Sequence, residues 1–436
     1  MRLLYNLSIY LYIFYVRVGS LFNAKAKLMI AGRKNIFENI NFLLKKSALL
    51  PIAIGTPDSK LVWFHCASLG EFEQGRPLME KLKLQQPNVK ILLTFFSPSG
   101  YEIRKNYTGA DFIFYLPMDT PSNAKKFIEI INPKKVFFVK YEFWFNYLSE
   151  LKNKNIPTYL VSGIFRENHH FFKSTGAWFR KQLSSFTHFF LQDEKSMELL
   201  NSIGYTNTTL CGDTRFDRVF EVAKNAKQID LVKLFVGDFK IMIVGSSWSE
   251  DEKIIANNFS NLKSSVTLSG VEGQNFKLII APHEINEKHL VSIETEFIPL
   301  LRGAGVCLRY SLANENNVKE AQVLIIDNIG MLSSLYQYGT IAFIGGGFGK
   351  GIHNILEAAT FGLPVIFGPN YQKFTEAKEL IKLGGAFSIN DISEFEKTML
   401  LLSDEQVLKM ASQISRMYVQ GRVGATEKIL SSTFPK

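Results

Sequence analysis

Short apolar runs recur along this chain, and segments long enough to form helices separate them. A first series comprises LVWFHC at 61–66, KILLTFF at 90–96, FIFYL at 112–116, KVFFVK at 135–140, TYLVS at 158–162 and THFFLQ at 187–192. A second series starts at Lys240 and comprises KIMIVGS, KLIIAP, GVCLR, AQVLIID, TIAFIGG and PVIFG. Strands of a parallel sheet are buried on both faces, so they are apolar continuously rather than at alternate positions. The two series therefore predict an α/β chain with two parallel, doubly wound sheets.

The length of the chain fits two such domains. Its 436 residues exceed a usual single domain, and 46% of them are apolar, which is enough for two cores. We expect an N-terminal Rossmann-like domain at 23–216, a polar linker at 217–238, and a C-terminal Rossmann-like domain with C-terminal helices at 239–436. The two domains are expected to face a common cleft, because doubly wound sheets bind ligands at the carboxyl ends of their strands.

Residues 1–22 predict an N-terminal membrane anchor. They are apolar and aromatic from Leu3 to Val16, a run shorter than the ~20 residues that cross a bilayer. No small-residue cleavage site follows convincingly, so a retained anchor is favoured over a signal peptide. The alternative is a buried first helix of the soluble domain.

Basic residues after this segment predict its orientation. Arg2 alone precedes the apolar run, whereas Arg17, Lys25, Lys27, Arg33, Lys34, Lys45 and Lys46 follow it. This asymmetry predicts that the bulk of the protein is cytoplasmic, and a set of these side chains would suit lipid phosphates: Lys25, Lys27, Arg33, Lys34, Lys45 and Lys46. The net charge of +10 fits anionic partners such as nucleic acid, phosphorylated substrates or an anionic membrane, without choosing between them.

The chain lacks the sequence patterns of several catalytic classes. Its three cysteines, Cys66, Cys211 and Cys307, are far apart, which indicates a reducing compartment and neither a disulfide framework nor a metal site. It has no Asp-x-Asp pair, no Cys/His cluster with zinc spacing, no Gly-x-Ser-x-Gly elbow and no Walker-type phosphate loop. Catalysis without a metal is the simpler interpretation.

The stretch at 340–377 has the order of a nucleotide-binding turn. An apolar strand is followed by a glycine cluster and then by a helix-compatible segment at 354–361; the glycines are Gly345, Gly346, Gly347, Gly349 and Gly351. Glycine lets a backbone approach a ligand, and the amides at a helix start favour phosphate. Glu357 would lie one turn into that helix, where its carboxylate can accept hydrogen bonds from ribose hydroxyls. The alternative is that the glycines only form a tight turn.

Ionisable side chains follow three apolar runs of the first half. Glu71 comes after 61–66 and is a candidate general base, because partial burial raises a carboxyl pKa. A carboxylate that stabilises a helix start is the alternative for Glu71. Glu142 follows 135–140 in the same way. Arg215 could reach an anion, or it could form an ordinary surface ion pair.

Taken together, these segments resemble a known enzyme family. In order, they are HCASLGE, KYEFWFN, SGIFREN, GDTRFD, IIAPHE and GGGFGKGIHNILEAATFGLPVIFGPN, behind an apolar N-terminus. The combination resembles 3-deoxy-D-manno-octulosonic acid (Kdo) transferase, a lipopolysaccharide core enzyme with the GT-B fold, and it spans nearly the whole chain. The resemblance implies an inverting, metal-independent glycosyltransferase that moves Kdo from CMP-Kdo to lipid IVA, the tetraacyldisaccharide 4'-phosphate precursor of lipid A.

The resemblance also implies a location and a set of partners. The enzyme would act at the cytoplasmic face of the cell inner membrane, held there by its N-terminal anchor. Its partners would be CMP-Kdo, the lipid A precursor and the inner membrane phospholipid surface, with no nucleic acid and no obligate protein partner. No cofactor is expected.

Residue roles follow from the matching motifs. Glu71 corresponds to the catalytic base of the family, and Glu142 and Arg215 correspond to groups that stabilise the transition state. The segments that hold CMP correspond to Pro282, His283, Ile329, Gly330, Met331, Asn354, Ile355, Leu356 and Glu357. The chain departs from the family pattern at two of these positions: Arg215 replaces a usual lysine, and His283 replaces a usual arginine.

Three other functions stay open at this point, because fold alone does not exclude them. One is a GT-B transferase that uses a UDP-sugar, another is a nucleotide-sugar epimerase of the same fold, and the third is a non-catalytic membrane scaffold.

Overall fold

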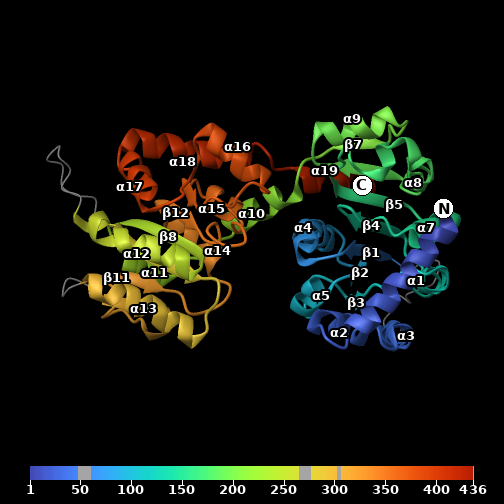
Figure 1. Cartoon of the computed structure of the whole chain (residues 1–436), viewed down its shortest axis with the longest axis horizontal. Helices are drawn as coiled ribbons and strands as arrows, with labels where there is room; N and C mark the ends of the chain where they lie inside the picture. The colour runs from blue at the N-terminus through green and yellow to red at the C-terminus, as the bar shows by residue number, and fades with distance from the viewer. Residues whose placement is uncertain (48–59, 265–275, 302–305, 436) are drawn as a thin grey trace. The chain divides into compact units, whose positions relative to one another are not determined.

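A parallel sheet forms the centre of each of two units in this chain (Figure 1). The computed structural model describes residues 1–47, 60–264, 276–301 and 306–435. Unit 1 comprises Met1–Arg218 and Val423–Lys436, and unit 2 comprises Val219–Arg422. Unit 2 thus begins inside the segment predicted as a linker, 217–238, and the end of the chain, predicted within 239–436, belongs to unit 1.

The sheet of unit 1 has seven parallel strands in the order β3-β2-β1-β4-β5-β6-β7. They are β1 (Leu61–Cys66), β2 (Lys90–Phe95), β3 (Phe112–Tyr115), β4 (Lys135–Val139), β5 (Thr158–Gly163), β6 (His188–Leu191) and β7 (Thr208–Leu210). The chain winds outward from β1 to β3 and then returns to β4, so the winding direction reverses between β1 and β4. Ligands of doubly wound sheets bind at such a switch point, beyond the carboxyl ends of the strands.

The sheet of unit 2 repeats this plan with the order β10-β11-β9-β8-β12-β13-β14. Its strands are β8 (Lys240–Ser247), β9 (Phe276–Pro282), β10 (Val306–Arg309), β11 (Ala321–Ile325), β12 (Ile341–Ile344), β13 (Val365–Phe367) and β14 (Ala386–Ser388). The winding direction reverses between β8 and β12. The predicted fold of two parallel, doubly wound sheets is therefore confirmed, unit by unit.

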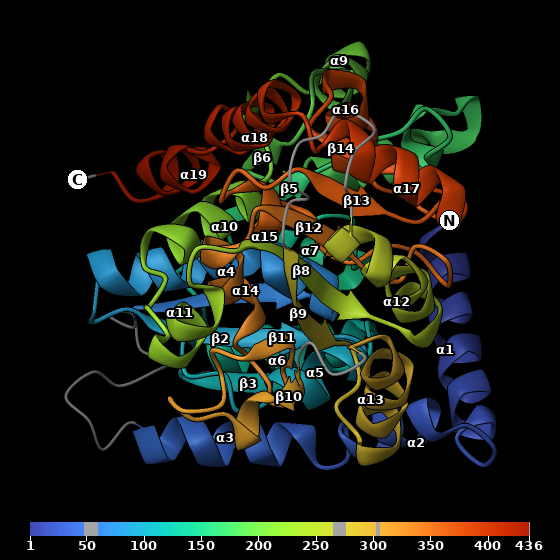
Figure 2. The same cartoon turned by 90° about the vertical axis from the view of Figure 1, so that its left-hand side faces the viewer.

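Helices cover both sheets. Those of unit 1 are α1 (Arg2–Gly19), α2 (Ala24–Ala31), α3 (Ile36–Ser47), α4 (Leu69–Gln85), α5 (Pro98–Arg104), α6 (Pro121–Ile131), α7 (Phe145–Asn153), α8 (Ala177–Leu183), α9 (Glu194–Ser202) and α19 (Ala425–Thr433), and α10 (Thr214–Lys224) contains the boundary. Those of unit 2 are α11 (Asp230–Val236), α12 (Ser249–Ser264), α13 (Glu287–Leu301), α14 (Leu332–Leu335), α15 (Leu356–Ala359), α16 (Thr375–Leu383), α17 (Ile392–Leu401) and α18 (Glu405–Gln420). Figure 2 shows α12 and α13 on one side of β8 and β9, and α11 and α14 on the other.

The apolar strands are explained by burial on two faces. Successive residues of β1 alternate between two clusters: Leu61 and Trp63 belong to one, and Val62 and Phe64 belong to the other. All four side chains are at most 2% exposed. Most positions of such a strand are therefore apolar, which produces the nearly continuous runs seen in the sequence, and a buried polar side chain such as His65 needs hydrogen-bond partners.

The C-terminal helix α19 belongs to unit 1 because its apolar side completes the core of that unit. Ala425, Ile429 and Leu430 are buried in the cluster that contains Phe72 of α4. The carboxylate of Asp217 accepts hydrogen bonds from the backbone amides of Gly424 and Thr426, at the start of α19. Sequence periodicity predicted a helix here, but it did not reveal which core the helix would complete.

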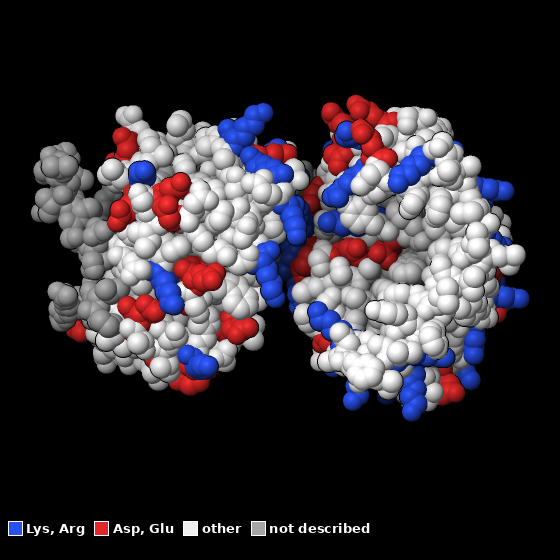
Figure 3. Space-filling model, viewed as in Figure 1, with Lys and Arg blue, Asp and Glu red and all other residues white. Residues whose placement is uncertain are grey.

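Helix α1 packs against unit 1 on one side only. Ile9 and Val16 are buried, and the Tyr5 ring contacts Phe145 and Trp178 at centroid distances of 4.9 and 5.9 Å. The other side is apolar and exposed, and it carries Leu3, Leu4, Leu7, Leu11, Phe14 and Tyr15. Figure 3 shows a broad uncharged area where α1 crosses unit 1 in Figure 1.

Helix α1 alone does not have the length and hydropathy of a membrane-spanning helix. Within the described ranges, no single helix is both long enough and apolar enough to cross a bilayer. Together, helices α1 and α2 are long enough and apolar enough for a span, although the chain bends by 119° between them. The predicted anchor at 1–22 is thus a helix packed on unit 1 by one side, and its action as an anchor stays a prediction.

Arg33, one of the basic residues predicted to contact lipid phosphates, instead binds backbone carbonyls of unit 1. The guanidinium of Arg33 donates to the backbone carbonyls of Leu116, Met29 and Phe96, and it lies 4.9 Å from the centroid of the Tyr115 ring. Burial lowers the pKa of Arg33 to about 10. Arg33 therefore fixes α2 to the sheet of unit 1 and is not available to a lipid phosphate.

Candidate active site

Glu71 lies at the turn from β1 to α4, as predicted. Ser68 is the N-cap of α4, and Glu71 is the third residue of the helix, so the two form a capping box. One oxygen of Glu71, Oε2, accepts hydrogen bonds from the backbone amides of Ala67 and Ser68. Glu71 thus stabilises the start of α4, as the alternative interpretation predicted. It also lies at the end of β1, where a catalytic base is expected.

The environment of Glu71 favours its neutral form despite these amide bonds. Burial raises the pKa of the Glu71 carboxyl, and the nearby carboxylate of Glu142 raises it further. The amides of Ala67 and Ser68 and the ammonium of Lys140 act in the opposite direction. Two carboxylates that share a buried site cannot both ionise easily, so one of them becomes a stronger base than an ordinary glutamate.

Glu142 lies in the loop between β4 and α7, and its side chain is held from two directions. Its Oε2 atom is 3.1 Å from Nε2 of His65, a fully buried side chain of β1. The indole of Trp144 donates a hydrogen bond to the same oxygen. Sequence analysis did not select His65 or Trp144, although a histidine inside the apolar run LVWFHC was a visible signal.

Arg215 lies in the first turn of α10 and is paired with a neighbour. Its Nε atom is 2.8 Å from Oδ2 of Asp213, and its backbone amide donates to Oδ1 of the same carboxylate. The hydroxyl of Thr214 donates to the carbonyl of Gln74 at 2.6 Å and lies 3.3 Å from the hydroxyl of Ser162. Thr214 thereby ties the turn that carries Arg215 to α4 and to β5.

Three residues at strand ends adopt a left-handed backbone that side chains disfavour. Lys140 follows β4 with a φ of 61°, Ser162 lies near the end of β5 with a φ of 54°, and Ser246 lies near the end of β8 with a φ of 52°. Such conformations cost about 1–3 kcal/mol each and are concentrated at functional sites. All three lie at the carboxyl ends of strands at or next to a switch point, where function is expected.

In unit 2, three aromatic rings stack at the carboxyl ends of the strands. Trp248 follows β8, His283 follows β9, and His353 follows the glycine cluster. The His283 ring lies 4.6 Å from the Trp248 ring and 4.5 Å from the His353 ring between centroids, with an interplanar angle of 26° in both pairs. Burial lowers the pKa of His353, and His283 lowers it further. The structure thus places His283, a predicted CMP contact, beside His353, where the sequence predicts a phosphate at 353–355, and it adds Trp248.

The glycine cluster is explained partly by packing within unit 2. A Cβ at Gly345 would lie 2.4 Å from the carbonyl oxygen of Ser246, and a Cβ at Gly347 would lie 2.5 Å from the amide nitrogen of Gly368. These two glycines therefore permit close contact between backbones, a packing reason that neither sequence interpretation included. Asp251 of α12 fixes the loop, since its Oδ2 accepts the amide of Gly346 at 2.9 Å.

The helix predicted at 354–361 is shorter in the structure, where α15 spans only Leu356–Ala359. The amide of Leu356, its first residue, already has a partner, because Oδ1 of Asn354 accepts it at 3.1 Å. The side-chain amide of Asn354 donates to Oε1 of Glu357 at 3.0 Å. Gly362 ends the segment with a φ of 82°, which explains why the helix cannot extend. Asn354 and Glu357 therefore lie together, whereas Ile355 and Leu356 are buried in the core.

The remaining predicted contacts with CMP are at other strand ends of unit 2. Pro282 ends β9, and the amide of His283 donates to the carbonyl of Ser247 at 2.9 Å. Ile329, Gly330 and Met331 form the turn before α14, where Ile329 is 88% exposed and Gly330 has a φ of 96°. Helix α14 and the residues after it pack on β8, because a Cβ at Gly245 would meet Leu332 and Tyr336.

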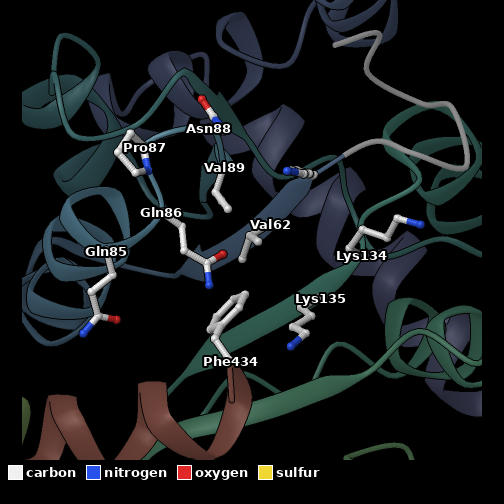
Figure 4. A pocket seen from close by; sticks show the side chains of 10 residues that line it. Val62, Gln85, Gln86, Pro87, Asn88, Val89, Lys134, Lys135 and Phe434 are labelled. Carbon is white, nitrogen blue, oxygen red and sulfur yellow. The ribbon is translucent and has the colours of Figure 1, made fainter. Parts of the chain in front are cut away.

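Figure 4 shows a pocket of unit 1 at the edge opposite to these acids. Its volume is about 450 Å³, and it is lined by Lys60, Val62, Gln85, Gln86, Pro87, Asn88, Val89, Lys134, Lys135 and Phe434. Lys60 precedes β1 and Lys134 precedes β4, so the pocket lies at the amino ends of the strands. Glu71 follows the carboxyl end of β1, and the pocket is therefore not part of the acid site.

Among the described residues, no group of three or more His, Cys, Asp or Glu side chains is placed to hold a metal ion. The predicted absence of a metal from the reaction stays a prediction.

Comparison with known proteins relates these features to a family. Residues 36–218 match the family model described as 3-deoxy-D-manno-octulosonic-acid transferase, or Kdo transferase. The chain is 29% identical over 356 residues to 3-deoxy-D-manno-octulosonic acid transferase of Aquifex aeolicus, covering 80% of this chain and 88% of the relative. It is 26% identical over 390 residues to the enzyme of the same name from Haemophilus influenzae, covering 87% and 88%.

Solved structures share the fold at low sequence identity. A UDP-GlcNAc 2-epimerase from Neisseria meningitidis has a TM-score of 0.57 and 16% identity, covering 86% of this chain and 100% of that chain. MurG from Acinetobacter baumannii has a TM-score of 0.52 and 12% identity, covering 85% and 98%. These likenesses concern the fold alone. The match in unit 1 and the sequence similarity along most of the chain make this protein similar to the Kdo transferases, a family of glycosyltransferases.

Proposed function

We propose that this protein transfers Kdo from CMP-Kdo to lipid IVA, with inversion at the anomeric carbon and without a metal ion or another cofactor. The observation that carries the proposal is the pair of carboxylates, Glu71 and Glu142, at the switch point of the unit 1 sheet. Similarity to the Kdo transferases supports the choice of Kdo as the sugar that is transferred. We assign the acceptor to unit 1 and the nucleotide of the donor to unit 2.

Glu71 is the base in this reaction. Its carboxylate takes the proton from the acceptor hydroxyl while that oxygen attacks the anomeric carbon of Kdo. The bond between this carbon and the phosphate oxygen breaks at the same time, and its electron pair leaves with CMP. A single displacement of this kind inverts the configuration at the attacked carbon. Because its environment raises the pKa of Glu71, its carboxylate accepts this proton more readily than an ordinary glutamate would.

Glu142 and Arg215 have opposite electrostatic roles. Positive charge develops on the sugar ring in the transition state, and a fixed carboxylate such as Glu142 stabilises it. Negative charge develops on the leaving phosphate, which a guanidinium can bind through two N–H groups. The ion pair with Asp213 orients the guanidinium of Arg215 for this role.

Unit 2 holds CMP through its strand-end residues in this proposal. Glu357 accepts the ribose hydroxyls, and the bond from Asn354 fixes the orientation of its carboxylate. The stacked rings of His283 and His353 offer ring nitrogens to the phosphate. Pro282 and the turn at 329–331 border the same strand ends and contact the cytosine.

The decisive experiment measures transfer from freshly generated CMP-Kdo to tetraacylated lipid A precursor, with EDTA present. The native protein should form product and release an equal amount of CMP, and Glu71→Gln should lose at least about 100-fold in rate. Glu73→Gln is the matched control, because Glu73 lies on the same helix as Glu71 but forms ion pairs with Arg104 of α5 and Arg218 of α10. Equal rates for native protein and Glu71→Gln would disprove the role of Glu71.

A donor panel separates this function from the alternatives that share the fold. CMP, CMP-Kdo and UDP-sugars are titrated into the folded protein by calorimetry, and only the cytidine compounds should bind. Asn354→Ala should weaken CMP binding, since Glu357 would lose a bond that orients it. Tight binding of a UDP-sugar would instead favour the transferase or epimerase alternative.

We also propose that the protein acts at the cytoplasmic face of the inner membrane. The exposed apolar side of α1, followed by Lys25, Lys27 and Lys34, supports a helix that lies in the membrane interface. Flotation with liposomes of anionic phospholipid tests this location. Leu7→Glu with Leu11→Glu should abolish flotation, because both side chains are exposed in the native fold. Glu substitutions at the exposed Leu312 of unit 2 and Leu84 of α4 are the control.

A further inference from the structure

Hydrogen bonds connect buried side chains of β1 and β2 to Glu142. Trp63 and His65 lie two positions apart on β1, so they point to the same face of the sheet. Thr94 of β2 lies directly opposite His65 in the strand register. The Thr94 hydroxyl is 2.8 Å from Nε1 of Trp63 and 2.8 Å from Nδ1 of His65. These three side chains are completely buried.

The chemistry of the indole group sets the direction of these hydrogen bonds. An indole N–H can only donate, so Trp63 donates to the Thr94 oxygen. The hydroxyl proton of Thr94 then needs an acceptor, and among the described residues that acceptor is Nδ1 of His65. Nδ1 therefore carries no proton, and the ring proton is on Nε2, which donates to Oε2 of Glu142 at 3.1 Å.

The other tautomer of His65 would reverse this arrangement. With its proton on Nδ1, the ring would point a lone pair from Nε2 toward the Glu142 carboxylate. The indole N–H of Trp144, which is 3.0 Å from Nε2, would then be drawn to the ring and away from Glu142. Glu142 would lose both of its donors, and its charged form would lose their stabilisation. The Thr94 hydroxyl is thus the group that selects between the two arrangements.

We propose that His65 is a positioning residue that, with Thr94 and Trp63 behind it, holds Glu142 as a carboxylate beside Glu71. The inference rests on the proposed function, in which Glu142 faces the reacting sugar. Both donors bind Oε2, and Oε1 accepts no hydrogen bond from the described residues. The arrangement therefore leaves one oxygen of the carboxylate for the substrate.

The charge on Glu142 matters because other ionisable groups surround it. Its negative charge raises the pKa of Glu71, and it also raises the pKa values of Cys66 and Tyr5, for which burial is the larger cause. Lys140 is the cation that acts against it at Glu71. Loss of the His65 donor should therefore release the Glu142 carboxylate from its position and weaken the effect of its charge on the basicity of Glu71.

The tautomer of His65 is measured first, because this measurement does not depend on any activity. Histidine-selective ¹⁵N NMR distinguishes protonated from unprotonated ring nitrogens, and His65→Gln assigns the signal among the seven histidines. In the neutral ring, the native protein and Thr94→Ser should carry the proton on Nε2. Thr94→Val, which removes only the hydroxyl, should shift the ring toward the Nδ1 form. A proton on Nδ1 in the native protein would overturn the inference even if Kdo transfer is confirmed.

A matched pair of variants then tests the effect on the reaction. In His65→Gln the side-chain amide still offers an N–H donor near the position of Nε2, whereas His65→Met has the same length without a donor. We expect kcat to fall on the order of 100-fold in His65→Met, with KM nearly unchanged, and to stay within about tenfold in His65→Gln. The acidic limb of the pH profile should move to lower pH only in His65→Met. Equal profiles in the two variants, both shown to be folded, would mean that His65 has only a structural role.

Discussion

The hydroxyl of Tyr5 donates a hydrogen bond to Oδ2 of Asp119 at 2.5 Å, and this bond joins the first helix of the chain to the loop after β3. Asp119 also accepts the backbone amides of Asn146 and Tyr147, at the start of α7. A predicted anchor segment is thus connected by a buried polar group to two other parts of unit 1.

Tyr5→Phe should destabilise unit 1, because it leaves a buried carboxylate without one of its donors. The expected loss in the free energy of unfolding is about 1–3 kcal/mol. Urea denaturation measures it. Tyr10→Phe is the control in the same helix, since Tyr10 is 53% exposed, and it should change the stability little. Equal stabilities of the two variants would show that the Tyr5 hydroxyl does not hold α1 in place.

The stability of unit 1 should depend on the ionisation of Asp119. Burial raises the pKa of Asp119 to about 6, and this effect exceeds the opposing effects of the Tyr5 hydroxyl and the two amides. The folded protein therefore binds the proton more tightly than the unfolded chain, whose aspartates have a pKa of about 4. Stability from this group is fully present below pH ~4 and is lost as the pH rises through 6.

Asp119→Asn isolates this contribution from those of the other carboxylates. The difference in the free energy of unfolding between native protein and variant should decrease from pH 4 to pH 6 and be constant above pH 7. Urea denaturation at each pH provides the values. A difference that is independent of pH would contradict the raised pKa.

Glu142→Gln should change the pH dependence of catalysis as well as its rate. The Glu142 charge raises the pKa of Glu71, so its removal should lower that pKa. The acidic limb of kcat/KM, which reports ionisation of the base, should then move to lower pH. Profiles of Glu142→Gln and the native protein are compared with CMP-Kdo as donor. A limb that stays in place would mean that the two carboxylates do not interact.

Gly347→Ala should destabilise unit 2, because the added methyl group would lie 2.5 Å from the amide nitrogen of Gly368 and neither backbone can move freely. The expected loss is about 1–3 kcal/mol, measured by thermal unfolding. Gly349→Ala in the same loop is the control. There the nearest heavy atom to an added Cβ is the Gly346 carbonyl oxygen, at 3.7 Å. If Gly349→Ala is the more damaging variant, packing is not the reason for Gly347.

Much of the fold and the position of the acids were visible in the sequence. Continuous apolar runs predicted most strands, because a strand buried on two faces is mostly apolar. Glu71 and Glu142 follow two of these runs, and the structure shows that their strands, β1 and β4, are neighbours. Two strands were missed: β7 and β14 are edge strands of three residues each, and such short segments carry little pattern of their own.

Other features depended on contacts between residues far apart in the chain, which no local pattern contains. Glu142 is bound by His65, 77 positions earlier, because strand pairing places β1 beside β4. The amide of Thr426 is bound by Asp217, 209 positions earlier, so α19 completes the core of unit 1. The sequence by itself determined which segments are buried and which residues end the strands. The tertiary structure decided the partners of those residues, because burial strengthens a charge interaction only between side chains that the fold brings together.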